Sequence, residues 1–192
     1  PSTIKGNGYN QKEKVQVFFG NFNLTSNVSI NRDGSISFDF LVPNHPRGAA
    51  VISVNTIDSS TQTTSTQTAI FSVESSISLS SKSAPVGETL GIIGSGFKPD
   101  EEVRIFVRTD EVKANADSGG SFRVNYEVPE LPNGKVSVIA SSIGIAETAN
   151  EFTVIPRISF NKNTGQAGEI ININGTGFNP RKNIKIQIGQ QS

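Results

Sequence analysis

Short segments in which apolar and polar residues alternate recur along the chain, separated by glycine, proline, asparagine and aspartate. Alternation at every second position is typical of a β-strand with one buried face. The three-to-four-residue spacing of an amphipathic helix does not occur in the sequence. The pattern therefore predicts an all-β protein, arranged as a sandwich or a barrel.

One short element, Gly-x-Gly followed by an aromatic residue, occurs three times. Its second glycine is Gly8, Gly96 and Gly177, so the copies lie 88 and 81 residues apart. Each copy precedes a strand pattern with apolar residues at alternate positions: Val15, Val17 and Phe19; Val103, Ile105 and Val107; Ile184, Ile186 and Ile188. A fixed element at a nearly fixed period indicates tandem repeats of one structural module.

A second match sets the length of the module. Residues 34–43 align without a gap with residues 120–129, and both segments read as a turn, a strand and a proline that ends it. We place the boundaries near Glu74 and Ile155. This gives repeat one, residues 1–74, without its first strand; repeat two, residues 75–155, complete; and repeat three, residues 156–192, with only its first strands.

Repeat two is expected to contain six or seven strands, and repeat one to contain five extra residues in its Ser59–Thr68 stretch, at a loop or hairpin tip. The candidate strands of repeat two are residues 77–80, 89–93, 102–108, 121–128, 135–141 and 149–154. The shared alternation predicts one core formed by Ile92, Val103, Ile105, Phe122, Val124, Tyr126 and Val138. Its counterpart in repeat one is formed by Ile4, Val15, Val17, Ile36, Phe38, Phe40 and Ile52.

The Gly-x-Gly-Phe-x-Pro stretches ending at Pro99 and Pro180 resemble the signature of TIG/IPT-like and related Ig-like repeats of bacterial and archaeal surface proteins. Repeat one departs from this signature after Tyr9. The resemblance implies tandem Ig-like β-sandwich domains. It also implies a role as spacer, stalk, adhesin or lattice module in a cell-surface layer or filament, because such repeats are strung in long arrays.

Composition excludes several classes of partner and chemistry. Seventeen basic residues balance seventeen acidic ones, so no net field favours nucleic acid. The apolar runs are far shorter than the roughly 18 residues of a membrane-spanning helix. The chain has no Cys, which removes disulfides, thiolate metal sites and thiol nucleophiles, and it has no Met, which indicates a processed or excised polypeptide. An extracellular, cell-surface location is inferred from these features together with the resemblance.

Residues that suggest catalysis or metal binding are few. His45 is the only histidine and lies in a turn, so we expect no catalytic triad, no enzyme activity and no cofactor. The acidic run Asp100–Glu102 has the oxygen ligands that Ca²⁺ prefers, but its equivalents in the other repeats are largely basic. We therefore interpret this run, and Asp117–Gly120, as solvated turns.

Glycan binding by a β-sandwich usually depends on exposed Trp or Tyr rings. The chain has no Trp, and its two tyrosines, Tyr9 and Tyr126, occupy motif and core positions. Phe18 and Phe106 share one repeat position and point away from the predicted core face, so they either mark an interface or are buried by loops of their own domain. The candidate interface residues are these two phenylalanines together with Ile184, Ile186 and Ile188.

Three sequons could carry N-linked glycans if the protein is secreted, at Asn23, Asn27 and Asn174. The chain is rich in Asn, Ser and Thr, so about three to four matches are expected by chance. The Ser59–Thr68 run is either O-glycosylated or a mobile hairpin tip.

These observations favour a non-enzymatic extracellular structural protein. The alternatives are an adhesin or glycan-binding module, and an accessory Ig-like segment of a larger secreted enzyme. Because residues 1–74 and 156–192 form unfinished sandwiches, we expect contacts beyond this chain at residues 1–9 and 157–192. The partners would be further repeats of the same polypeptide, or copies of the chain that complete one another's sheets by strand addition.

Overall fold

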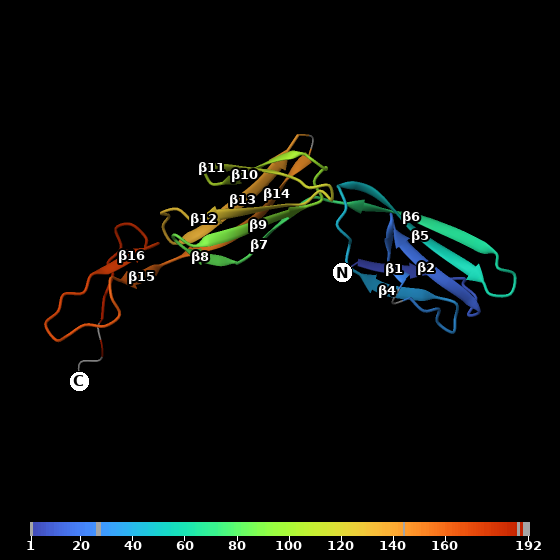
Figure 1. The fold of residues 1–192 in the computed structure, drawn as a ribbon, viewed down its shortest axis with the longest axis horizontal. Coiled ribbons are helices and arrows are strands. Elements are labelled where there is room, and N and C mark those ends of the chain that lie inside the picture. Colours follow the sequence, from blue (N-terminus) through green and yellow to red (C-terminus); the bar gives the residue numbers. More distant parts are fainter. Residues whose placement is uncertain (1, 26–27, 144, 188, 190–192) are drawn as a thin grey trace. The chain divides into compact units, whose positions relative to one another are not determined.

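The structure, a computed structural model, describes residues 2–25, 28–143, 145–187 and 189 (Figure 1). Contacts divide the chain into two compact units. The first contains Pro1–Ser75 with Ser95–Glu101 and Ala116–Ser121, and the second contains Ser76–Gly94, Glu102–Asn115 and Phe122–Ser192. Strands dominate both units, as the alternating sequence pattern predicts. The boundaries of the repeats and their number remain predictions.

Repeat one forms two antiparallel sheets. Its strands are β1 (Ser2–Gly6), β2 (Glu13–Phe19), β3 (Phe22–Asn23), β4 (Ile36–Phe40), β5 (Gly48–Asp58) and β6 (Thr64–Val73). One sheet pairs β1 with β4, and the other has the order β3-β2-β5-β6. Residues from both sheets share one core that includes Val17, Phe19, Ile36, Phe40 and Ile52. Repeat one is therefore a β-sandwich.

Repeat two is an Ig-like sandwich with more strands. They are β7 (Ser76–Leu79), β8 (Ser83–Pro85), β9 (Thr89–Ser95), β10 (Glu102–Val107), β11 (Asp110–Asn115), β12 (Phe122–Glu127), β13 (Gly134–Ser142) and β14 (Ile145–Ile155). One sheet has the order β12-β9-β7 and the other β11-β10-β13-β14-β8. The pairs β10–β11, β10–β13, β9–β12 and β13–β14 are antiparallel. The pair β8–β14 is parallel, because the chain changes sheets between β7 and β8. Two sheets connected in this way are the Ig-like arrangement.

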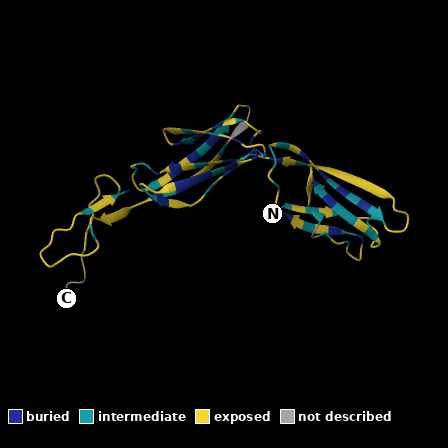
Figure 2. Cartoon of the chain, in the orientation of Figure 1, coloured by how far each residue is buried: buried dark blue, intermediate teal, exposed yellow. Residues whose placement is uncertain are grey.

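The predicted cores are confirmed. In repeat two Ile92, Val103, Ile105, Phe122, Tyr126 and Val138 are buried, and Val124 is half-buried. In repeat one Val17, Ile36, Phe40 and Ile52 are buried, whereas Ile4, Val15 and Phe38 are half-buried and pack against that core. Burial of one face at every second position, coloured in Figure 2, is what the alternation required.

Two strands of repeat two were not predicted. The sequence of β11 is polar, Asp110-Glu-Val-Lys-Ala-Asn115, because β11 is the edge strand of its sheet. The strand β8 has only three residues and ends at Pro85, too short for an alternating pattern to be visible. Both lie at sheet edges, where burial constrains the sequence least.

The extra residues of repeat one lie in a long hairpin, as expected. Strands β5 and β6 pair from Gly48 and Val73 out to Ile57 and Thr64, so only the segment between Asp58 and Thr64 forms the tip. The rest of the Ser59–Thr68 run belongs to β6, whose first seven residues are exposed and appear as a yellow arrow in Figure 2. The insertion therefore lengthens a hairpin more than it lengthens a loop.

Repeat three contributes two short strands to the second unit. Strand β15 (Arg157–Phe160) pairs antiparallel with β16 (Ile173–Thr176). Every residue of β15 is exposed. The pairing repeats that of β7 with a neighbouring strand of repeat two, since β15 and β16 occupy the sequence positions of β7 and β9.

Candidate functional site

The Gly-x-Gly-aromatic element has the same backbone turn in each repeat. Its second glycine has a positive φ of 85° at Gly8, 77° at Gly96 and 74° at Gly177, a region that other residues rarely adopt. A Cβ at Gly96 would lie 2.5 Å from the carbonyl oxygen of Glu74, and one at Gly177 would lie 2.8 Å from that of Ile155. In both repeats the glycine lets the turn contact the backbone that leads out of the preceding repeat.

The first glycine of the element is covered by an aromatic ring. A Cβ at Gly6 would lie 2.8 Å from the ring of Tyr9, and one at Gly94 would lie 2.1 Å from the ring of Phe122. At Gly175 the nearest atom, at 2.8 Å, belongs to the ring of Phe178. An aromatic ring therefore covers the first glycine in every repeat: the aromatic residue of the element itself, Tyr9 or Phe178, in repeats one and three, and Phe122 of a neighbouring strand in repeat two.

The turn that follows the element explains the acidic run of repeat two. Asp100 and its repeat-three equivalent Arg181 both have a φ of 60°. The carboxylate of Glu101 accepts a hydrogen bond from the backbone nitrogen of Lys98 at 3.1 Å. Glu102 forms an ion pair with Lys113. Within the described parts of the chain no three His, Asp or Glu side chains gather into a metal site, and this run is occupied in holding a turn and a strand edge.

Asp117 also serves a turn. Its carboxylate oxygen accepts hydrogen bonds from the backbone nitrogens of Gly119 and Ser121, each at 2.9 Å. Asp117–Gly120 is thus a turn, as the sequence indicated, and Asp100–Glu102 is a turn that leads into β10.

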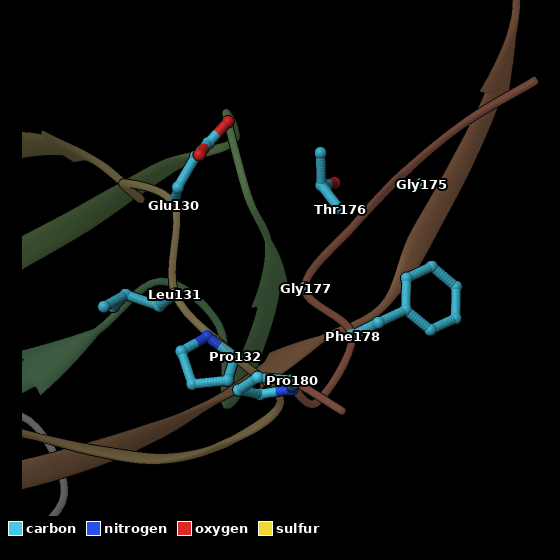
Figure 3. Close-up of a pocket in the computed structure, with 8 residues that line it drawn as sticks. All are labelled: Glu130, Leu131, Pro132, Gly175, Thr176, Gly177, Phe178 and Pro180. Atoms are coloured by element: carbon cyan, nitrogen blue, oxygen red, sulfur yellow. The ribbon is translucent and has the colours of Figure 1, made fainter. Parts of the chain in front are cut away.

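A pocket of about 320 Å³ lies in the second unit, where the Pro-x-Gly turn of repeat two meets the Gly-x-Gly-Phe element of repeat three (Figure 3). Its lining residues are Glu130, Leu131, Pro132, Gly175, Thr176, Gly177, Phe178 and Pro180. Only one of these side chains is ionisable. Both walls consist of segments that have a counterpart elsewhere in the chain, since the Pro-x-Gly turn also occurs at Pro46–Gly48 and the Gly-x-Gly-Phe element at Gly94–Phe97.

A larger groove of about 440 Å³ lies along β2 in repeat one. In repeat two the equivalent strand β10 pairs with β11 along its whole length, but β2 pairs with β3 only at Phe18 and Phe19. Beyond that point the Thr25 hydroxyl bonds to both the nitrogen and the carbonyl of Val17. The groove lies along the remaining part of β2 and is lined by Gln11, Glu13, Lys14, Val15, Gln16, Thr25, Val28, Ser29, Ile30 and Ile57.

This groove was not predicted from the sequence. It forms because the segment after β3 leaves the sheet early. The sequence patterns of β2 and β10 are nearly identical, so the sequence of β2 does not indicate the groove. The available signal was the poor match of residues 22–30 to residues 110–118, where repeat two has a charged strand and repeat one has Asn, Ser and Thr.

Tyr126 has a buried ring and a hydroxyl that reaches the opposite sheet. The hydroxyl donates to the Asp110 carboxylate at 2.7 Å, joining β12 to β11. Burial first, and then the neighbouring carboxylate, raise the pKa of Tyr126 well above its ordinary value. The contact is structural, because the phenol stays neutral and serves only as a donor.

Phe18 and Phe106 are both half-buried in the structure. The guanidinium carbon of Arg104 lies 5.2 Å from the centre of the Phe106 ring, and its nitrogens form a bidentate ion pair with Glu111. This pair lowers the pKa of Glu111. Side chains of the same sheet therefore cover much of Phe106, and its role as an interface stays a prediction.

The other candidate interface residues lie in repeat three. Ile184 is 54% exposed and Ile186 is 62% exposed. Ile188 lies outside the described residues. The structure therefore leaves the described part of this predicted strand as an exposed apolar segment without regular pairing.

The sequon asparagines Asn23 and Asn174 are exposed, as glycosylation would require, and Asn27 lies outside the described residues. The Asn23 side chain accepts a hydrogen bond from the backbone nitrogen of Thr25. His45 is half-buried, its ring nitrogen bonds to the carbonyl of Pro46, and its ring meets the edge of Phe19. It is a turn residue at the border of a core.

No protein-family model matches the chain, and no curated protein matches it in sequence. The chain is similar to solved structures of low sequence identity, among them the following three. SGBP-B from a complex xyloglucan utilization locus of Bacteroides uniformis is 17% identical, with a TM-score of 0.31, over 79% of this chain and 44% of that protein. Parabacteroides merdae β-glucuronidase is 11% identical, with a TM-score of 0.31, over 74% of this chain and 21% of the enzyme. The fibronectin(III)-like modules of Clostridium thermocellum CbhA are 12% identical, with a TM-score of 0.29, over 79% of this chain and 84% of those modules.

The chain thus spans less than half of the first two proteins. In the part of the chain that the structure describes, no helix is long and apolar enough to cross a membrane.

Proposed function

We propose that this chain is a non-enzymatic structural module of an extracellular surface layer, filament or stalk, built from tandem Ig-like repeats. The observation that carries the proposal is the second glycine of the recurring element. At Gly96 and at Gly177 this residue brings the turn of one repeat against the backbone of the segment that leads into it, at Glu74 and Ile155. A linking segment that packs against the repeat it leads into suits a module that transmits shape or force along an array of repeats.

The side chains with the strongest interactions support a structural role. The Tyr126–Asp110 hydrogen bond joins two sheets, and the Arg104–Glu111 pair joins two strands of one sheet. The single histidine faces a carbonyl and a phenylalanine ring. Each of these groups is engaged in holding the sandwich, and we propose no catalytic role for any of them.

Cryo-electron tomography of the producing cells tests this function. Cells that carry the gene, cells that lack it and complemented cells would be compared for a periodic layer, filaments or stalks. The proposal expects one of these features to disappear with the gene and to return with the complementing copy. A cell envelope that is unchanged by the deletion would contradict the proposal.

A matched control separates a structural role from mere expression. Complementation with Gly177→Val is expected to fail, because a side chain there adopts an unfavourable φ and meets the Ile155 carbonyl. Complementation with Gly189→Val, which also alters a glycine of positive φ but has no atom near its Cβ, is expected to succeed. Equal success of the two would contradict a structural role for the junction.

A second candidate function, glycan binding or adhesion, is favoured by the groove along β2. Its 440 Å³ lies within the size range of small-ligand sites. Polar side chains of Gln11, Glu13 and Gln16 can bond to sugar hydroxyls, and Val15 and Ile57 supply apolar contact. A glycan array with the wild-type chain and a Gln16→Ala variant tests it. Saturable binding that the variant loses would support a glycan-binding module, and no binding would remove it.

A further inference from the structure

We infer that the outer edge of strand β6 is a surface at which two copies of the chain pair, β6 against β6, in antiparallel orientation. The segment that forms this surface is Thr64–Thr68. The inference goes beyond the proposed function, because it identifies a contact between copies, and it stands whether or not the protein belongs to a surface layer. It rests on a strand edge that is unpaired and unprotected, and on a sequence that is complementary to itself.

The edge of β6 is open. It is the last strand of its sheet, and within the described residues it pairs only with β5. The Asp58 nitrogen donates to the Thr63 carbonyl at 3.0 Å, so the backbone of Thr63 faces β5. Backbone groups alternate in direction along an antiparallel strand, so those of Thr64, Thr66 and Thr68 face away from β5. These amides and carbonyls are available to another strand.

The same part of the edge is open in repeat two, which has the strands β7 and β8. There β14, the equivalent of β6, pairs with β8 at Thr153–Ile155, which correspond to residues 72–74. Within the described residues, the part of β14 before Thr153 pairs only with β13. A strand like β8 therefore covers only the end of this edge near Val73. The opening at Thr64–Thr68 is a property of the long hairpin itself.

The open edge of β6 lacks the residues that keep strand edges apart. Charged side chains and proline on an edge strand oppose pairing with another strand. The segment Thr64–Thr68 has neither, and all five of its residues are exposed, as the yellow arrow of Figure 2 shows. Counted back from the matched residues Phe71 and Phe152, the place of Thr66 is taken in repeat two by Glu147. Repeat two thus has a charged residue in the middle of an edge that repeat one leaves uncharged.

The sequence of the segment, Thr-Ser-Thr-Gln-Thr, favours a second copy as the partner, because it reads nearly the same in both directions. Antiparallel pairing about Thr66 places Thr64 opposite Thr68 of the second copy, Ser65 opposite Gln67, and Thr66 opposite Thr66. Pairs of Thr and other hydroxyl residues are favourable across strands, and no pair brings like charges together. This twofold pairing would join the sheets of two copies into one continuous sheet.

Sedimentation equilibrium of the full chain tests the inference. The wild-type chain is expected to form a dimer whose population rises with concentration. Thr66→Glu and Thr66→Lys are each expected to weaken this dimer about fivefold or more, because two like charges then face each other across the paired strands. An equimolar mixture of the two variants is expected to dimerise at least as well as the wild type, because Glu then faces Lys.

Two control variants separate strand pairing from other contacts. Thr66→Val keeps an uncharged β-branched residue at the edge and is expected to dimerise as the wild type does, because the backbone forms the contact. Every substitution at Thr66 also removes its hydrogen bond to Asn55, so this loss cancels in the comparison. Val51→Glu places a carboxylate on the outer face of β5, one strand in from the edge, where Val51 is 50% exposed. It is expected to leave the dimer nearly unchanged.

Amide hydrogen exchange measured by NMR locates the contact. The amides of Thr64, Thr66 and Thr68 are expected to exchange more slowly as the concentration rises, since they become paired in the dimer. The amides of β2 and β5 show in the same spectra that each variant keeps its fold.

Four results would overturn the inference. They are a chain that stays monomeric, a dimer that Thr66→Glu leaves intact, a mixture of the Glu and Lys variants that does not dimerise, and loss of the dimer in Val51→Glu. The second result would place the contact elsewhere on the chain, and the last would show that the sheets pack face to face. A monomeric chain would leave the proposed surface-layer role standing, because the deletion experiment tests that role separately.

Discussion

The ring of Phe122 fills the space above Gly94, its registered partner on the neighbouring strand. A Cβ at Gly94 would lie 2.1 Å from the nearest ring atom, closer than any real contact of that kind. Both residues are buried, so neither can move into solvent. The first glycine of the recurring element in repeat two is therefore required by packing, because the ring of Phe122 occupies the space that a Cβ would need.

Gly94→Ala is expected to destabilise repeat two by about 2–3 kcal/mol, because the added methyl group must push the Phe122 ring out of a filled core. Amide hydrogen exchange of β9 and β12 measures the change. Gly91→Ala in the same strand is the control, since its Cβ would lie 3.3 Å from the nearest atom and needs only a small adjustment. Combining Gly94→Ala with Phe122→Leu should recover part of the loss. Equal effects of the two alanine substitutions would contradict this account.

Gly120→Ala is expected to cost more than Gly87→Ala, although the two glycines have nearly the same φ, 78° and 79°. Both variants pay the strain of a side chain at positive φ, about 1 kcal/mol. Only Gly120 also lies against a carbonyl: a Cβ there would be 2.1 Å from the oxygen of Phe97, whereas nothing lies within 4 Å of one at Gly87. Chemical denaturation of the two variants gives the comparison, and a smaller loss for Gly120→Ala would show that the turn is not packed as described.

Tyr126→Phe is expected to destabilise repeat two by about 1 kcal/mol at neutral pH, because Asp110 loses its hydrogen-bond donor. The difference should depend on pH. The pKa of Tyr126 is raised in the folded state, so its contribution is complete below the unfolded pKa of about 10 and is lost as the pH rises above that value. Denaturation from pH 8 to pH 11 checks this. A gap between wild type and variant that stays constant or widens above pH 10 would contradict the assignment.

Much of the fold could be predicted from the sequence because burial imposes a period of two. Val103 and Ile105 alternate with polar residues, and they are buried as that alternation requires. The gapless match of the two longer repeats also gave the turns, since Gly34 and Gly120 both have a φ of 78°. These features repeat because the same backbone conformation and the same core are built twice.

The edge strand β11, the groove along β2 and the packing of an aromatic ring on Gly94 could not be predicted in the same way. Strand β11 is held by its neighbour β10 and by ion pairs such as that of Glu102 with Lys113, which leave no apolar pattern. The groove along β2 arises where a strand is missing, and a missing partner leaves no mark on β2 itself. The packing of an aromatic ring on Gly94 depends on which strand lies beside it, and a single sequence does not show that pairing.

Single-molecule stretching of the chain tests most directly whether it is built from separate load-bearing sandwiches. We predict two unfolding events, one releasing about 250 Å from Ser2–Val73 and one about 280 Å from Ser76–Ile155, at roughly 3.5 Å per residue. Gly94→Ala should lower the force of the second event and leave the first unchanged. A single event that releases the whole length, or unfolding without a measurable force, would contradict the tandem structural role.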